Sequence, residues 1–159
     1  MISLRSITED NWLAIARIEH APGQGRFVGD ALEILARAYV YRAHRARALA
    51  VYAGEKPVGV LLVRDLDEEP ACYDLQELLI DQRHQNKGYG QAALRLLLQK
   101  LKAEGKYPRV DLYVERKDLA AIHVYQKVGF VDTGYIDPGA PTSINMSYSL
   151  SSDSSEESL

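Results

Sequence analysis

The feature that most constrains the fold is a succession of a strand, a glycine-containing loop, a long helix and a second strand. Residues 71–80, ACYDLQELLI, and 109–115, RVDLYVE, predict two mostly apolar strands. Residues 88–102 lie between them and carry alanine and leucine at the spacing of one helical face. A strand–helix–strand unit of this kind joins parallel strands through a right-handed crossover. The segment therefore predicts a parallel pair of strands covered by a helix.

The rest of the chain predicts one α+β domain built around this unit. Helices are expected at 11–18, capped by Thr8 or Asp10, and then at 31–44 and 119–128. Further strands, which we expect to pair as antiparallel hairpins, are predicted at 2–7, 47–53, 56–64, 130–136 and 142–150. We expect a single domain over residues 1–150, with a mixed and mostly antiparallel sheet. The Ser/Glu-rich tail, residues 151–159, is expected to be disordered.

Charge and cysteine content narrow the class of protein. The net charge of the 159 residues is −3, but the tail holds Asp153, Glu156 and Glu157, and the remainder has 19 basic and 19 acidic residues. A neutral body argues against nucleic-acid binding, which calls for a basic surplus. The sequence has no apolar run long enough to span a membrane, and its first residues are not expected to form a signal peptide, because they lack a basic segment followed by an apolar one. Its single cysteine, Cys72, cannot form an internal disulfide, so a cytoplasmic location is expected, and its apolar neighbours predict that it is buried.

The loop DQRHQNKGYGQAAL, residues 81–94, places Gly88 and Gly90 at the start of the long helix. The glycines can serve a tight turn, or they can let a phosphate approach the free N–H groups of the helix. His84 is either a donor beside that phosphate or an ordinary surface residue. GYGQAA also matches the G-x-G-x-x-A dinucleotide pattern. That alternative is disfavoured because residues 81–87 separate the strand from the glycines and the chain is too short for two mononucleotide-binding halves.

Two motifs together resemble the GCN5-related N-acetyltransferases, the GNAT superfamily. QNKGYG, residues 85–90, is similar to the family's Q/R-x-x-G-x-G/A signature, and DLAAIHVYQKVGF, residues 118–130, resembles its N-x-x-A-I-x-x-Y-x-x-x-G-F hallmark. The expected order of strands and helices is also similar, and the resemblance covers residues 1–150. The stretch GQGRFVGDALEILARAYVY and the later KPVGVLLV look more specifically like the branch that acetylates the polyamines spermidine and spermine.

The resemblance implies acetyl-CoA as co-substrate and a central strand pair splayed apart to admit it. It implies that the diphosphate binds the backbone of the loop residues Gln85, Asn86, Lys87, Gly88, Tyr89, Gly90 and Gln91. The pantetheine arm would pair with the strand end at Leu78, Leu79 and Ile80. Asp118 stands where the family usually has an asparagine that bonds the pantetheine, and an ionised aspartate cannot donate that hydrogen bond.

The implied chemistry is the attack of an amine on a thioester. An N–H near Leu78 or Leu79 would stabilise the oxyanion, and Tyr125, at the hallmark position, would protonate the leaving thiolate. The base is expected to be Glu77, with Asp74 second, because Gln76 replaces the glutamate of many relatives. Strand alternation puts Asp74 and Glu77 on opposite faces unless a bulge re-aims Glu77.

A polyamine acceptor calls for acidic side chains. Glu19 and Glu33 are the candidates on the first two helices, and a turn contributes Asp65, Asp67, Glu68 and Glu69 unless that turn is merely solvated. Alternatives are an acetyltransferase for an antibiotic or a protein N-terminus, and a non-catalytic acyl-CoA-binding regulator. No metal site is expected from the histidine and cysteine spacing, and the resemblance also allows a homodimer.

Overall fold

The computed structural model describes residues 1–23, 25 and 29–151. Across these residues a sheet runs in the order β1-β2-β3-β4-β5-β7-β6. Its strands are β1 (Ile2–Ser6), β2 (Arg47–Ala53), β3 (Lys56–Leu66), β4 (Cys72–Ile80), β5 (Arg109–Glu115), β6 (Val131–Asp132) and β7 (Ser143–Ser149). Neighbouring strands are antiparallel except β4 and β5, which are parallel. The predicted α+β class and its parallel pair are confirmed.

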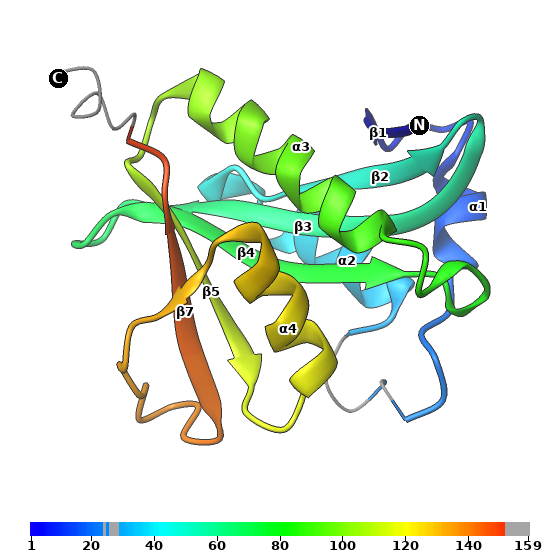
Figure 1. The fold of residues 1–159 in the computed structure, drawn as a ribbon. Helices are drawn as coiled ribbons and strands as arrows, with labels where there is room; N and C mark the ends of the chain where they lie inside the picture. Colours follow the sequence, from blue (N-terminus) through cyan, green and yellow to red (C-terminus); the bar gives the residue numbers. More distant parts are fainter. Residues whose placement is uncertain (24, 26–28, 152–159) are drawn as a thin grey trace, which may run out of the picture.

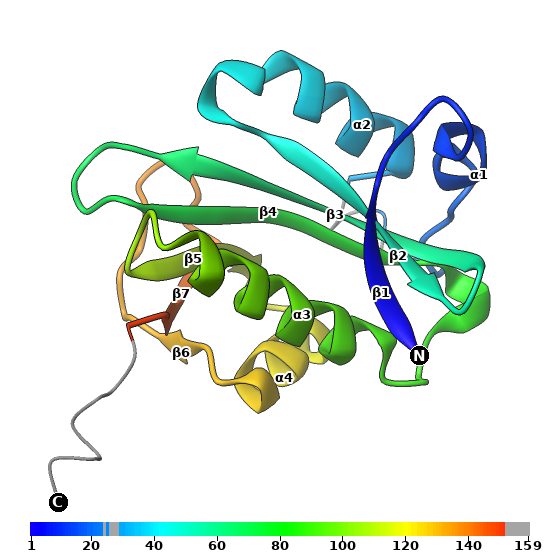
Figure 2. The same cartoon turned by 90° about the horizontal axis from the view of Figure 1, so that it is seen from above.

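Helices cover both faces of the sheet (Figures 1 and 2). The short α1 (Trp12–Ala16) and α2 (Ala31–Val40) lie on one face, while α3 (Tyr89–Glu104) and α4 (Leu119–Val128) lie on the other. One apolar cluster joins the sheet to α3 and α4, and a second joins it to α1 and α2. Both faces are therefore buried, which explains the run of apolar residues from Val58 to Val63 in β3. No described helix is both long and apolar enough to cross a membrane.

The helix ends mostly follow local sequence signals. Asp30 caps α2 by accepting the Glu33 N–H at 2.8 Å, and Asp118 caps α4 by accepting the Ala121 N–H at 3.2 Å. The expected cap of α1 was wrong, because Asn11 occupies the cap position and Thr8 and Asp10 precede it. The predicted second helix also ends early, at Val40, and one turn of 3-10 helix, Arg42–His44, follows. Tail residues 152–159 lie outside the described part of the chain.

The parallel strands β4 and β5 pair only over a short stretch. Their last paired residues are Leu75 and Leu112, although β4 continues to Ile80 and β5 to Glu115. Figure 1 shows the two strands diverging beyond this point. The backbone of β4 after Leu75 therefore loses its neighbour on one edge and faces the opening between the strands.

A bulge at Gln76 changes which side chains of β4 share a face. Leu62 of β3 pairs with Glu77, but the next residue of β3, Val63, pairs with Leu75, so Gln76 is the extra residue. Because the bulge shifts the alternation by one position, Glu77 lies on the same face as Asp74, toward α1 and α2. Simple alternation would have placed these two carboxylates on opposite faces.

The acidic segment at the end of β3 is solvated in part, because Asp67, Glu68 and Glu69 are exposed whereas Asp65 is buried. Asp65 is 2% exposed and accepts hydrogen bonds at 2.8 Å from both Arg45 and Lys106. Asp67 accepts a hydrogen bond from the Tyr107 hydroxyl. These pairs join the hairpin to the end of α3, so Asp65 is a structural carboxylate rather than part of an acceptor groove.

Cys72 is 3% exposed, as expected for a packing residue. Burial, together with the carboxylates of Asp111 and Asp74, raises the pKa of its thiol to about 11. The thiol is therefore neutral at pH 7 and has little nucleophilic character.

Candidate active site

A cavity of about 240 Å³ lies where β4 and β5 separate. It is bounded by the end of β4, the loop after it, the first turn of α3 and the first half of α4. Most of the residues predicted to bind acetyl-CoA line it: Leu78, Leu79, Ile80, Gln85, Asn86, Gly88, Tyr89, Gly90, Gln91 and Asp118. Tyr125 also lines the cavity, whereas Lys87 does not. The fold thus brings the two sequence motifs together around one opening.

The loop after β4 presents the first turn of α3 to this cavity. Asn86 and Gly88 adopt positive φ angles of 62° and 79°, which reverse the chain before the helix begins. The first intrahelical hydrogen bond runs from the Ala92 N–H to the Gly88 carbonyl, at 3.0 Å. The N–H groups of residues 89–91 therefore have no intrahelical partner, and the Gly88 cap offers no side-chain acceptor. Such a turn favours an anionic group.

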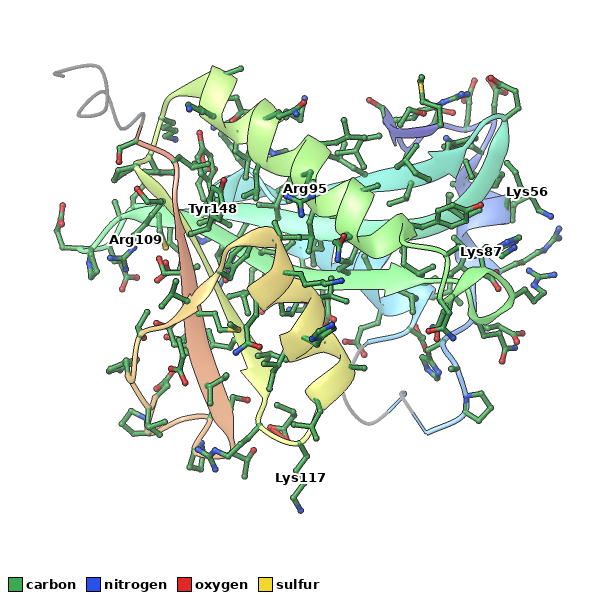
Figure 3. All side chains as sticks on the ribbon, in the orientation of Figure 1. Lys56, Lys87, Arg95, Arg109, Lys117 and Tyr148 are labelled. Atoms are coloured by element: carbon green, nitrogen blue, oxygen red, sulfur yellow. The ribbon has the colours of Figure 1, made fainter. Side chains whose placement is uncertain are left out.

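The charges around this loop also favour an anion. Burial lowers the pKa of His84, and the nearby cations Lys56 and Lys87 lower it further, which reflects a positive environment. Both lysines lie at the end of the molecule that carries this loop (Figure 3). Asp81, the acidic residue at the start of this loop, is neutralised by Arg83 at 2.9 Å. Sequence reasoning did not single out Lys56, which precedes the loop by a whole hairpin.

The free edge of β4 supplies backbone donors to the opening. The Asp81 N–H donates to the Val58 carbonyl of β3 at 2.8 Å, and Leu79 pairs with Val60. Since N–H directions alternate along a strand, the N–H groups of Leu79 and Asp81 face β3, and those of Leu78 and Ile80 face the opening. Of the two donors expected for an oxyanion, Leu78 therefore has the right direction.

Tyr125 lies on α4, partly buried against Phe130, with ring centroids 5.8 Å apart. Burial raises the pKa of its phenol above the usual value, and the charges of Glu77 and Asp118 raise it further. The phenol is thus protonated at neutral pH. Among the described residues its hydroxyl has no hydrogen-bond partner, so the proton is not committed elsewhere. Ala121, one helical turn earlier, lines the same cavity and could have been found from the i, i+4 spacing.

Glu77 does not line this cavity, and its side chain is held on the other face of β4, by α2. Its carboxylate accepts hydrogen bonds from Arg37 at 2.8 Å and from the Gly29 N–H at 3.4 Å, and its side chain is 14% exposed. Burial raises the pKa of this carboxyl above its ordinary value, and the Arg37 guanidinium opposes that effect. Glu33 joins the cluster because its carboxylate lies 3.7 Å from Arg37.

The other acidic candidates have different surroundings. Asp74 is bonded to Arg64 at 3.0 Å, and burial raises its pKa against the effect of that guanidinium. Glu19 contacts Gln82 instead, accepting the Gln82 N–H at 2.7 Å on its carbonyl and the side-chain amide at 2.9 Å on its carboxylate. The sequence suggested neither Arg37 nor Arg64, because Glu77 lies 40 residues from Arg37 and the pair of Arg64 with Asp74 depends on the register between β3 and β4.

Comparison with known proteins identifies the family. The model of the acetyltransferase (GNAT) family matches residues 11–130, which is most of the chain. The protein therefore belongs to the GNAT family of acetyltransferases. The expected resemblance, the N-acetyltransferase class and acetyl-CoA as co-substrate are confirmed at the level of this family.

Among the relatives, the chain is 27% identical to a spermine/spermidine N(1)-acetyltransferase from Bacillus subtilis over 141 residues, covering 86% of this chain and 91% of that protein. The structure is similar to a spermidine N-acetyltransferase from Vibrio cholerae in complex with CoA and spermine (TM-score 0.72, 16% identity, 94% of this chain and 95% of that one). It is also similar to an aminoglycoside acetyltransferase in complex with coenzyme A, with a TM-score of 0.76 and 18% identity. That match covers 94% of this chain and 95% of the other. At these identities the two structures show a shared fold.

Proposed function

We propose that this protein transfers the acetyl group of acetyl-CoA to a primary amine of a polyamine such as spermidine or spermine. The observation that carries the proposal is the opening between β4 and β5, which is lined by the first turn of α3 and by Tyr125, with Glu77 on the face of β4 that α2 covers. The polyamine class is supported by the 27% identity to a spermine/spermidine acetyltransferase over most of both chains.

The residues present fit the chemical groups of acetyl-CoA. The N–H groups in the first turn of α3, with Lys56 and Lys87 nearby, suit the diphosphate. The N–H groups of Leu78 and Ile80 suit an extended amide chain that adds to the free edge of β4. Asp118 uses one carboxylate oxygen, Oδ1, to cap α4, which leaves it an acceptor rather than a donor toward the opening.

Each proposed catalytic group has one task. Acetyl-CoA supplies the acetyl group as a thioester. Glu77 accepts a proton from the substrate ammonium so that the amine nitrogen can form the new C–N bond. The Leu78 N–H stabilises the negative charge that develops on the acyl oxygen. Tyr125 donates its proton to the departing sulfur as the C–S bond breaks, and its raised pKa keeps that proton in place beforehand.

Acceptor recognition is assigned to the carboxylates near α2. Glu33 lies toward solvent, with 57% of its side chain exposed, and Glu77 lies deeper, at 14%. This gradient suits a chain with spaced ammonium groups, one at Glu77 for reaction and another near Glu33. Glu19, bonded to Gln82, and the buried Asp65 are weaker candidates.

A substrate panel tests this assignment. We expect CoA release to be fastest with spermidine or spermine, with a kcat/KM about tenfold or more above those for an aminoglycoside and a peptide N-terminus, because one well-placed ion pair contributes about 1.4 kcal/mol or more. The measurement is thiol release followed with a chromogenic disulfide. Faster turnover of another amine class would move the assignment to that class. Acetyl-CoA binding without turnover of any amine would indicate a regulator.

The Gly90→Ala variant tests the cofactor cradle. A Cβ at Gly90 would meet Ile80 Cγ1 at 3.7 Å and Leu78 Cδ2 at 3.9 Å, which are ordinary contacts. Alanine also favours the helix by about 0.5–1 kcal/mol, so the apo-protein should melt at the same or a higher temperature. The added methyl narrows the space for the diphosphate, and a clash of about 1–3 kcal/mol lowers CoA affinity roughly tenfold to hundredfold.

Titration calorimetry with CoA and thermal melts measure the two effects separately. Gly139→Ala is the matched control, because its Cβ would meet only Asp137 Oδ1, at 3.7 Å, in the loop before β7. Unchanged CoA affinity in Gly90→Ala would contradict the proposed cradle.

A further inference from the structure

Arg37 is the cation that contacts Glu77 among the residues that the structure describes. Its Nη1 lies 2.8 Å from Glu77 Oε1 and 3.7 Å from Glu33 Oε2. Its Nη2 lies 3.2 Å from the side-chain oxygen of Gln76 when that amide is oriented to satisfy its neighbours. Because the guanidinium is a rigid planar fork, contacts at both nitrogens fix its position and its tilt. Only 27% of the side chain is exposed.

The contacts continue along the sheet as an alternating series. The same Gln76 oxygen lies 3.3 Å from Arg64 Nε, and Arg64 bonds Asp74 at 3.0 Å. The Tyr41 ring covers the Arg64 guanidinium, with the centroid 5.0 Å from Cζ. The bulge at Gln76 thus places a neutral acceptor between two guanidiniums, each of which has its own carboxylate. This arrangement leaves Arg37 assigned to Glu77 and Arg64 assigned to Asp74.

We propose that Arg37 is a positioning residue that keeps Glu77 ionised and holds its carboxylate in place on the face of β4 that α2 covers. The inference rests on the proposed role of Glu77 as the base. Arg37 stays charged throughout and donates no proton. The proton that leaves the substrate ammonium passes to a Glu77 oxygen, and the amine nitrogen keeps the electron pair that forms the C–N bond.

The groups that face Glu77 explain why it needs this partner. Burial disfavours its carboxylate form, and so does the neighbouring charge of Glu33 on α2. Tyr125 on α4, whose phenol is affected by the charge of Glu77, is neutral at pH 7. Arg64 and Asp74 lie beyond the Gln76 amide. Arg37 therefore supplies the main positive charge that keeps Glu77 deprotonated.

The test is the pH dependence of kcat/KM in Arg37→Gln. The active form of Glu77 is the carboxylate, so activity falls as pH drops through its pKa. Loss of an opposite charge raises a carboxyl pKa by about 1–3 units. We therefore expect the acid limb of the kcat/KM profile, where activity falls as pH drops, to lie at a pH that is higher by about one unit or more. Arg37→Lys keeps the charge and should keep the limb near the wild-type position, with a smaller loss of kcat.

Arg64→Gln is the matched control. It removes the same charge from the same series of contacts, but its carboxylate partner is Asp74. Its acid limb should stay near that of the wild type. A shift in Arg64→Gln without one in Arg37→Gln would overturn the inference and identify Asp74 as the base.

A titration that needs no turnover separates this inference from the proposed function. The Glu77 carboxyl carbon, assigned by its loss in Glu77→Gln, can be followed by NMR after 13C-glutamate labelling. In Arg37→Gln it should titrate at a higher pH than in the wild type. If it does so while the acid limb stays fixed, Arg37 holds Glu77 but Glu77 is not the base. If it does not move, Arg37 has no such role, whatever the enzyme acetylates.

Discussion

Replacing Tyr125 by phenylalanine is expected to lower kcat about 100-fold or more, with little change in CoA affinity. General acid catalysis typically contributes about 10²–10⁴-fold, and phenylalanine has no proton to give to the leaving sulfur. Each tenfold loss corresponds to about 1.4 kcal/mol of activation free energy. The ring would keep its packing against Phe130. Since the hydroxyl has no partner among the described residues, its removal leaves no unpaired buried group, and the melting temperature should hardly change.

Tyr148→Phe is the control for that experiment. Tyr148 packs against the same Phe130, with ring centroids 5.5 Å apart, but it does not line the cavity that contains Tyr125. It should retain wild-type kcat. Equal turnover by Tyr125→Phe and the wild type would exclude Tyr125 as the acid, and a loss of stability in Tyr125→Phe alone would indicate a packing role.

The second large effect is expected for Glu77→Gln. Glutamine keeps the shape of the side chain but cannot accept the ammonium proton, so kcat/KM at pH 7 should fall about 100-fold or more. The acid limb of the pH profile should disappear. In its place, the rate should increase as the pH approaches the pKa of the amine, near 10, because free amine then forms without the help of a base.

Asp74→Asn is the comparison for Glu77→Gln, because Asp74 shares the same face of β4 and is the second candidate for the base. If Glu77 is the base, Asp74→Asn should retain the acid limb. A limb that survives in Glu77→Gln and vanishes in Asp74→Asn would reverse the assignment. Initial rates across pH 5–10 with saturating acetyl-CoA measure both variants.

Much of the fold could be predicted because its signals are local. The Asp30 and Asp118 caps and the apolar face of α3 depend on residues within a few positions of one another. The crossover from β4 through α3 to β5 follows from strand twist and chain handedness. Where several residues able to cap a helix stand close together, as Thr8, Asp10 and Asn11 do, the sequence did not decide which of them caps it.

The sequence by itself determined the strand–loop–helix element with Gly88 and Gly90, and the helix that carries Tyr125, since each depends on short-range geometry. The motif resemblance supplied the family. Only the tertiary structure decided the surroundings of the carboxylates. The bulge at Gln76 depends on the register between β3 and β4, and the partners of Glu77 and Asp65 come from distant segments. Whether a carboxylate is a buried structural group or a candidate base depends on its burial and on the charges beside it, and long-range packing sets both.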